Sequence, residues 1–283
     1  MQSVDLNHLR TWIGKEASAE DWLTPRLSET FLATFTPHLF KVPPEQAPLG
    51  IHWCLVAPTT PTLELTIDGH PPRGDFLPPV PLPRRMWAGS EVSHFSALPV
   101  GVTVTRRSKI MDVQLKSGRT GQLCIVSAEH EYLANSHVYV RERQSLVYRE
   151  APPPGPQGLS PGGERPQGKP ALTWEVETTP ALLFRYSALM FNAHRIHYDQ
   201  QYTAEVEGYP GLVVQGPVQA GTMLNLAATL QGSVPKAFNC RGVGFLIGGR
   251  PFQAHAIRRS PTEIECYTQD ANERVNMMAT FRW

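Results

Sequence analysis

The distribution of proline constrains this chain more than any other feature of its sequence. Of the 27 prolines among 283 residues, 21 precede residue 171. Six of them fall within residues 71–83, and seven fall within residues 151–170 together with five glycines. Proline lacks an amide donor and fixes φ, so neither segment can form a helix or a central strand. We therefore predict an extended loop at 71–83 and a linker at 151–170 that separates the domains 1–150 and 171–283.

Hydrophobic periodicity predicts the same kind of structure in both halves. The first half has helical spacing at 18–40, a short apolar piece at 50–56 that suits a helix or a strand, and strand composition at 94–97, 101–112, 121–132 and 145–149. In the second half, helices are expected at 181–191, 198–206 and 217–230, and strands at 171–177, 238–244, 250–259, 263–270 and 275–283. Helices followed by an antiparallel meander, twice, indicate an α+β fold with an internal repeat. Two unrelated α+β domains are the alternative.

Charge and cysteine content argue against several classes of protein. The 26 Lys and Arg residues balance 25 Asp and Glu residues. Proteins that bind nucleic acids or membrane surfaces usually have a positively charged surface instead. Four cysteines stand apart without a CxxC pair, so neither a disulfide framework nor a zinc knuckle is indicated. No segment has the apolar length of a signal peptide or a transmembrane helix. We expect a cytoplasmic protein with no nucleic-acid or membrane partner.

The densest polar cluster is the segment YSALMFNAHRIHYD at residues 186–199. A second segment, YPGLVVQGP at 209–217, brings Gly216 to the start of an apolar helix. The unpaired N–H groups and partial positive charge of a helix N-terminus can stabilise a thioester enolate. A histidine such as His197 can move a proton to or from water. A base and an oxyanion donor form a minimal hydration apparatus, although isolated histidines are more often structural.

The same cluster permits other interpretations. His194 and His197 could ligate a metal with Asp199, but no cysteine or second carboxylate supports this, and we predict no metal. His194 is more simply a hydrogen-bonding residue that orients the loop. Arg195 could bind a substrate carboxylate, or it could form a salt bridge with Asp199 or Glu205.

The two segments resemble the signature of the MaoC-like enoyl-thioester hydratases and dehydratases, which have the hot-dog fold. In that family an Asp and a His stand five positions apart, and the matching positions here are Asn192 and His197. The run before Gly216 resembles the approach to the central hot-dog helix, whose glycine N–H polarises the thioester carbonyl. Including RRMWAG at 84–89, the resemblance covers nearly the whole chain. It is strongest to type 2 hydroxyacyl-thioester dehydratases and to mesaconyl-CoA and itaconyl-CoA hydratases.

The resemblance implies a double hot dog, in which each half wraps an antiparallel sheet around a long central helix. It implies a catalytic second half, a first half that shapes the acyl pocket, no cofactor apart from the CoA of the substrate, and by analogy a homodimer. The implied reaction is reversible hydration of an enoyl-CoA, in particular of itaconyl-CoA or mesaconyl-CoA to citramalyl-CoA in itaconate degradation. A 3-hydroxyacyl-carrier-protein dehydratase and a non-catalytic module that binds acyl thioesters are the alternatives.

Asn192 departs from the Asp of the family, because an amide can hold water but cannot accept its proton. We therefore expect His197 to transfer the proton, Asn192 to hold the water, and the Gly216 N–H to stabilise the enolate. Whether His194, Tyr186 or Asp199 assists is open. Trp87 is more simply a core or loop anchor than an adenine platform. Paired arginines such as Arg84 and Arg85 could bind CoA phosphates, although most of the arginine pairs are more simply solvated residues of strand faces and turns. The expected substrate-binding residues are Tyr186, His194, Arg195, Val214, Gln215, Arg84, Arg85 and Trp87.

Overall fold

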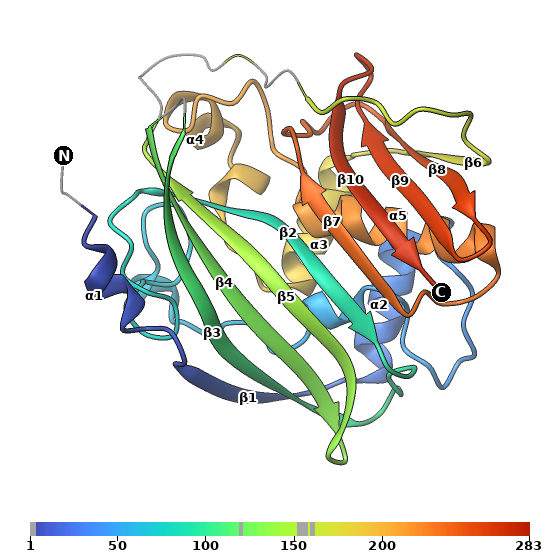
Figure 1. Ribbon diagram of the computed structural model, residues 1–283, viewed down its shortest axis with the longest axis horizontal. Coiled ribbons are helices and arrows are strands. Elements are labelled where there is room, and N and C mark those ends of the chain that lie inside the picture. Colours follow the sequence, from blue (N-terminus) through green and yellow to red (C-terminus); the bar gives the residue numbers. More distant parts are fainter. Residues whose placement is uncertain (1–3, 119–120, 152–157, 159–161) are drawn as a thin grey trace.

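The computed structural model describes residues 4–118, 121–151, 158 and 162–283. Ten strands form one antiparallel sheet in the order β1-β3-β4-β5-β2-β7-β10-β9-β8-β6 (Figure 1). The strands are β1 (Glu16–Trp22), β2 (Arg84–His94), β3 (Thr103–Gly118), β4 (Gly121–Ala134), β5 (His137–Arg149), β6 (Leu172–Val176), β7 (Ala237–Gly242), β8 (Phe252–Ser260), β9 (Glu263–Gln269) and β10 (Val275–Arg282). The helices are α1 (Leu6–Arg10), α2 (Pro25–Phe35), α3 (Pro180–Leu189), α4 (Gln200–Glu205) and α5 (Gly216–Gln231), with the 3-10 turns η1 (Ile51–Cys54), η2 (Thr62–Glu64) and η3 (Arg195–His197).

The strand order contains an internal repeat. From its outer edge the first half reads β1-β3-β4-β5-β2 and the second reads β6-β8-β9-β10-β7, so the two have the same topology and meet where β2 pairs with β7. The first long helix of each half also begins alike, because Thr24 caps α2 and Thr179 caps α3, each followed by a proline. The predicted α+β repeat is confirmed.

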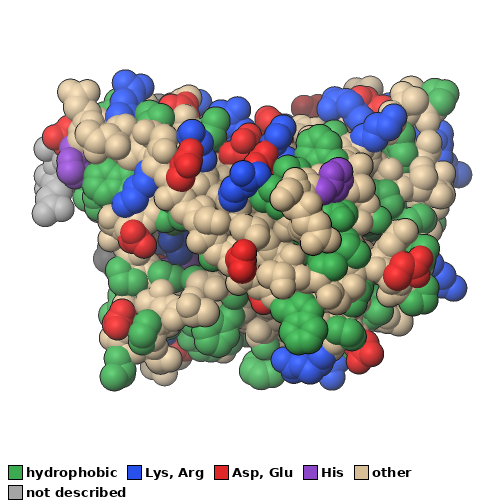
Figure 2. Space-filling view, turned by 90° about the horizontal axis from the view of Figure 1, so that it is seen from below, with side chains coloured by type: hydrophobic (Ala, Val, Ile, Leu, Met, Phe, Trp, Pro, Cys, Tyr) green, Lys and Arg blue, Asp and Glu red, His purple; other side chains and the backbone are tan. Residues whose placement is uncertain are grey.

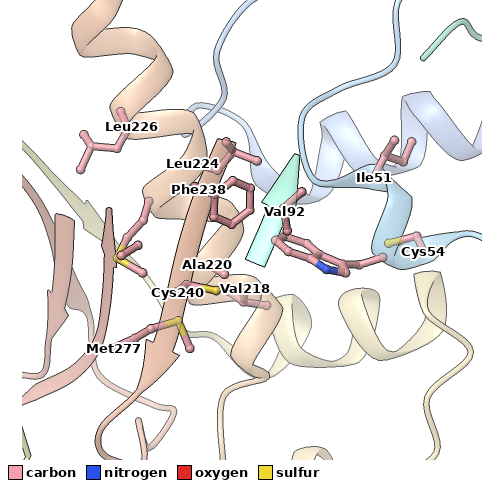
Figure 3. Packing of buried hydrophobic residues seen from close by; sticks show 14 of the residues in the cluster. Ile51, Cys54, Val92, Val218, Ala220, Leu224, Leu226, Phe238, Cys240 and Met277 are labelled. Carbon is pink, nitrogen blue, oxygen red and sulfur yellow. The ribbon is translucent and has the colours of Figure 1, made fainter. Parts of the chain in front are cut away.

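The two halves differ in the helix that the sheet encloses. Residues 218–228 of α5 are all buried, so this helix lies within the protein. Figure 3 shows its side chains, among them Val218 and Leu224, in the same cluster as Phe238 of β7 and Ile51 of η1. A long central helix was expected in each half, but the described helices of the first half span at most 11 residues. There the buried turn η1 contributes to the core instead.

Two predicted elements of the first half differ from the structure. The segment 18–40 is not one helix, because Glu16–Trp22 is an edge strand paired with β3 and α2 begins only at Pro25. Helical spacing is a local signal, and cross-strand pairing overrides it. The strand expected at 94–97 lies instead at Arg84–His94, where it pairs with both β5 and β7. It begins directly after the prolines of 71–83, which suggested a loop there.

Other expectations agree with the structure where it describes them. The segment 71–83 contains no helix or strand, and the four cysteines are free and buried. Of the linker predicted at 151–170, residues 152–157 and 159–161 lie outside the described residues, and Gly163 forms an isolated bridge with Val275. None of the described helices has the length and apolar character needed to cross a membrane. On the face in Figure 2, acidic and basic side chains are interspersed rather than gathered into a basic area.

Candidate active site

A cavity of about 1340 Å³ is lined by residues of both halves. The second half contributes the segments around Asn192 and Gly216, and the first half contributes the proline-rich loop and the inner faces of β2 to β5. Most of the predicted site residues are brought together here: His197, Asn192, Gly216, His194, Val214, Gln215, Arg84, Arg85 and Trp87.

The side chain of Asn192 is oriented by its own segment. After α3 ends, Phe191 adopts a left-handed conformation, with φ of 49°, and the Asn192 N–H donates to the carbonyl of Ser187 at 2.8 Å. The amide oxygen of Asn192 accepts from the N–H of His194 at 3.0 Å. Because the oxygen is engaged in this way, the amide nitrogen is left to donate to a ligand.

His197 is buried and held in one tautomer. Its Nδ1 lies 2.7 Å from the carbonyl oxygen of Val213. A carbonyl can only accept, so Nδ1 carries the proton and Nε2 keeps its lone pair. Burial lowers the pKa of His197 to about 4, and the hydrogen bond to Val213 opposes this shift. At neutral pH, His197 is therefore an uncharged hydrogen-bond acceptor on the cavity wall.

Gly216 begins α5, where the first N–H groups have no acceptor within the helix. A Cβ at this position would lie 2.7 Å from Cζ3 of Trp87, so only glycine leaves room for the indole. The indole N–H of Trp87 donates to Ser90 Oγ at 3.1 Å. Trp87 thus packs against the start of the helix. This agrees with its interpretation from the sequence as an anchor.

Val214 and Gln215 fix the chain that leads into α5. The Val214 N–H donates to the carbonyl of Leu246 at 2.9 Å. The side-chain nitrogen of Gln215 donates to the carbonyl of Leu183 at 3.0 Å and to Ser187 Oγ at 2.9 Å. These bonds tie the helix start to α3, which precedes Asn192.

Two of the predicted substrate-binding residues do not line the cavity. Arg195 forms a salt bridge with Asp199 at 2.7 Å and lies over the ring of Tyr202, so the salt-bridge alternative is correct. Asp199 also caps α4 through the Tyr202 N–H, so it does not complete a metal site with the two histidines. Tyr186 is buried in the core, where it packs against Phe35.

The two arginines of the RRMWAG segment have different roles. Arg84 is paired with the buried carboxylate of Glu207 and donates to the Val206 carbonyl at 2.7 Å. Arg84 therefore secures a neighbouring loop, and the structure does not support its assignment to a phosphate. Arg85 lines the cavity next to Tyr148, its cross-strand neighbour on β5. Within the described residues, no carboxylate lies within ion-pair distance of Arg85.

The first half adds polar residues that the sequence analysis missed. Asp68 and His70 lie just before the proline-rich loop 71–83 and line the cavity beside His194. Their only local signal is an Asp-Gly-His triplet whose glycine has φ of +87°. Arg106, His130 and Gln144 reach the cavity from the inner faces of β3, β4 and β5.

Comparison with solved structures defines the fold class. The chain matches HtdX of Mycobacterium tuberculosis with a TM-score of 0.65, 14% identity and coverage of 95% of this chain and 99% of HtdX. It matches a MaoC-like dehydratase of Phytophthora capsici with a TM-score of 0.70, 14% identity and 99% coverage of both chains. A further M. tuberculosis protein, described as having a double hot-dog fold, matches with a TM-score of 0.59 and 11% identity over 95% of each chain. The predicted double hot dog is confirmed.

Sequence comparison then identifies the family. The family model described as hydroxyacyl-thioester dehydratase type 2 matches residues 50–247. The chain is 37% identical over 273 residues to mesaconyl-C(4)-CoA hydratase of Chloroflexus aurantiacus, covering 95% of each protein. It is 28% identical over 199 residues to the mitochondrial hydroxyacyl-thioester dehydratase type 2 of Schizosaccharomyces pombe, covering 62% of this chain and 65% of that protein. The chain belongs to the hydroxyacyl-thioester dehydratase type 2 family.

Proposed function

We propose that this protein adds water reversibly to the double bond of an enoyl-CoA whose acyl group carries a second carboxylate, giving citramalyl-CoA from mesaconyl-CoA. The observation that carries the proposal is the presence in one cavity of a buried acceptor nitrogen, an amide donor and a helix N-terminus, at His197, Asn192 and Gly216. The similarity to a mesaconyl-C(4)-CoA hydratase supports the same substrate class.

The geometry assigns each group a task in hydration. The free N–H of Gly216 donates to the thioester oxygen and stabilises the enolate that forms when water adds to the β carbon. His197 Nε2 accepts a hydrogen bond from that water, and the Asn192 amide donates one to its oxygen. Enolate stabilisation requires conjugation with the thioester, which favours mesaconyl-CoA of the two predicted substrates. The reaction needs no cofactor beyond the CoA of the substrate.

Arg85 is the group that we assign to the second carboxylate. It lines the same cavity as His197 and has no acidic partner among the described residues. In a mesaconyl thioester linked through C4, the free carboxylate is bonded directly to the β carbon, so it lies close to the reacting water. An arginine binds such a carboxylate through two parallel hydrogen bonds.

The inner wall of the first half argues against a long acyl chain. Arg106, His130 and Gln144 line the cavity there, and Gln144 donates to the buried carboxylate of Glu142 at 3.0 Å. An alkyl chain laid against these groups would remove water from them without replacing its hydrogen bonds. A short polar acyl group avoids this cost, and this distinguishes the proposal from a fatty-acid dehydratase.

The first experiment follows the loss of enoyl absorbance with mesaconyl-C4-CoA, itaconyl-CoA, crotonyl-CoA and hexadecenoyl-CoA. We expect hydration of mesaconyl-C4-CoA and a loss of at least about 10²-fold in kcat for His197→Ala. His255→Ala is the matched control, because His255 is also buried but does not line the cavity. Full activity of His197→Ala, or preference for the long-chain substrate, would contradict the proposal.

The second experiment tests the carboxylate. Loss of a charge-assisted hydrogen bond costs about 1.5–3 kcal/mol, so Arg85→Met should lower kcat/KM for mesaconyl-C4-CoA by about 10- to 150-fold. Crotonyl-CoA has no second carboxylate, and its kcat/KM should change little. Equal decreases in kcat/KM for the two substrates would show that Arg85 does not bind the second carboxylate.

A further inference from the structure

A loop of the first half, residues 66–70, lies directly against the segment that carries the predicted catalytic residues. The Arg195 N–H donates to the carbonyl of Asp68 at 2.9 Å. Gly69 comes so close that a Cβ there would lie 2.7 Å from the carbonyl carbon of Ala193. The loop is therefore held in a fixed position relative to the active site.

Asp68 and His70 form a carboxylate–histidine pair within this loop. Nδ1 of His70 lies 2.9 Å from Oδ2 of Asp68, and the other carboxylate oxygen accepts from the His70 N–H at 3.1 Å and from the Thr66 hydroxyl. Burial acts to raise the pKa of Asp68, but the contacts with His70 and Thr66 hold it far below its usual range. Because an ionised carboxylate only accepts, the proton of neutral His70 is on Nδ1, and Nε2 keeps its lone pair.

His70 is close to the other histidines of the site. The centroid of its ring is 4.0 Å from that of His194, which in turn is 5.3 Å from that of His197. All three line the cavity. His70 and His197 thus each keep Nε2 as an acceptor in the same cavity, and the ring of each neighbours that of His194.

His70 and His197 differ in the neighbouring groups that would stabilise the imidazolium formed when the ring takes up a proton. His197 is oriented by the neutral carbonyl of Val213, and Asn192 beside it is a neutral amide. Among the described residues, Asp68 is the one carboxylate within ion-pair distance of a histidine. An imidazolium formed at His70 would therefore lie beside an anion, whereas one at His197 would be buried without a counter-charge.

The same atoms could be considered as metal ligands, because Asp68, His70 and His194 offer donor atoms within 4.8 Å of one another. However, Nδ1 of His70 is engaged by Asp68, and the rings of His70 and His194 are tilted by 39° with their centroids 4.0 Å apart. The arrangement is more typical of an acid–base pair.

We propose that His70 is the acid–base residue of the reaction and Asp68 is its positioning residue. The first half would then supply the carboxylate that Asn192 cannot provide. This inference rests on the proposed function and deepens it. This proposal assigns to His70 the proton transfer that the sequence led us to expect of His197. His197 and Asn192 then hold the water.

The step balances in protons and electrons. The water oxygen forms a bond to the β carbon, its O–H bond breaks, and the proton moves to Nε2 of His70. The π electrons pass to the thioester as an enolate at the N–H of Gly216. His70 then returns the same proton to the α carbon, which restores the neutral imidazole.

Paired glutamine variants of the full-length protein test the assignment, with the enoyl-CoA that the wild type hydrates. Glutamine can accept a hydrogen bond from water but cannot take its proton. We expect His70→Gln to lower kcat by about 10³-fold or more. The fold-loss in kcat of His197→Gln should be at least about ten times smaller. Equal losses, or a larger loss in His197→Gln, would overturn the proposal.

The variant Asp68→Asn tests the positioning role through the pH dependence of kcat, which would not change if Asp68 only stabilised the structure. The charged and titratable groups that face His70 are Asp68 on its own loop, Arg73 beyond it, Arg85 on β2, and His194 and His197 on the opposite segment. Removing the carboxylate destabilises the imidazolium, so the acidic limb of the kcat profile should move to lower pH while kcat falls about 10²- to 10⁴-fold. A lower kcat with an unmoved limb would overturn the role of Asp68.

Two controls distinguish a failure of the acid–base role of His70 from a failure of the proposed function. If the wild-type protein hydrates no enoyl-CoA, the proposed function fails. If the wild type is active but His70→Gln is also active, only the role of His70 fails. Dialysis against EDTA should leave the activity unchanged, and a loss that Zn²⁺ restores would show that the cluster binds metal instead.

Discussion

Replacing Gly216 with alanine tests whether the start of α5 acts as the oxyanion donor. A Cβ at this position would lie 2.7 Å from Cζ3 of Trp87, whereas ordinary Cβ contacts begin at 3.4 Å. Cε3 of Trp87 would lie closer still, so the ring and the helix start must separate by more than about 0.7 Å, and the hydrogen bond from Trp87 to Ser90 limits how far the ring can move. A misplacement of about 1 Å can cost about 10²-fold in rate, while overpacking costs about 1–3 kcal/mol. We expect kcat to fall about 10²-fold and Tm to fall by only a few degrees.

The assay is the decrease of enoyl absorbance under saturating substrate, together with thermal unfolding. Gly221→Ala is the matched control, because it lies in the same helix and its Cβ would meet Trp53 at an ordinary 3.6 Å. It should keep the wild-type kcat. The double variant Gly216→Ala/Trp87→Leu should recover part of the lost kcat by giving the methyl group room. Wild-type kcat in Gly216→Ala, or an equal loss in Gly221→Ala, would refute the reasoning.

Two further predictions concern the docked loop and the buried histidines. Gly69→Ala should lower kcat at least about tenfold, because its Cβ meets the backbone of Ala193, whereas Gly74→Ala shares the positive φ but meets nothing closer than 3.8 Å; similar kinetics in the two variants would contradict this. Burial lowers the pKa of His52 to about 3 and of His130 to about 4. From about pH 6.5 down to 4 the unfolded chain therefore binds protons that the native protein does not, and the free energy of unfolding should fall as pH falls through this window. Urea titrations at pH 7, 5.5 and 4.5 measure this, and a constant free energy of unfolding would contradict it.

The fold was predictable from sequence where local pattern and tertiary environment agree. Strand β4 alternates buried and less buried residues, and the buried helix α5 is largely apolar, so both could be recognised. The edge strand at Glu16–Trp22 could not be recognised, because its burial pattern is almost entirely exposed and pairing with β3 alone defines it. The central strand β2 was hidden for a different reason, since it begins directly after a run of prolines.

The candidate site was likewise predictable only in part. Asn192, His197 and Gly216 lie within two short segments, where spacing and resemblance are informative. The partners that decide what each group does come from far along the chain. Arg84 is paired with Glu207, 123 positions later, and only the folded protein shows that this arginine is not available to a phosphate.

The first half differs from the second in having no described helix comparable to α5, and its loops and turns line the cavity. The sheet of that half has the strand order of the second half, yet its described helices span at most 11 residues, and the buried turn η1 contributes to the core. Asn225 of α5 supports these loops, because its amide accepts from the Phe40 N–H at 3.0 Å and donates to the Leu49 carbonyl at 3.3 Å. One helix therefore serves both halves, and the segment without a helix carries Asp68 and His70 to the active site. The oxyanion donor comes from the second half and the carboxylate–histidine pair from the first, so the proposed chemistry requires both.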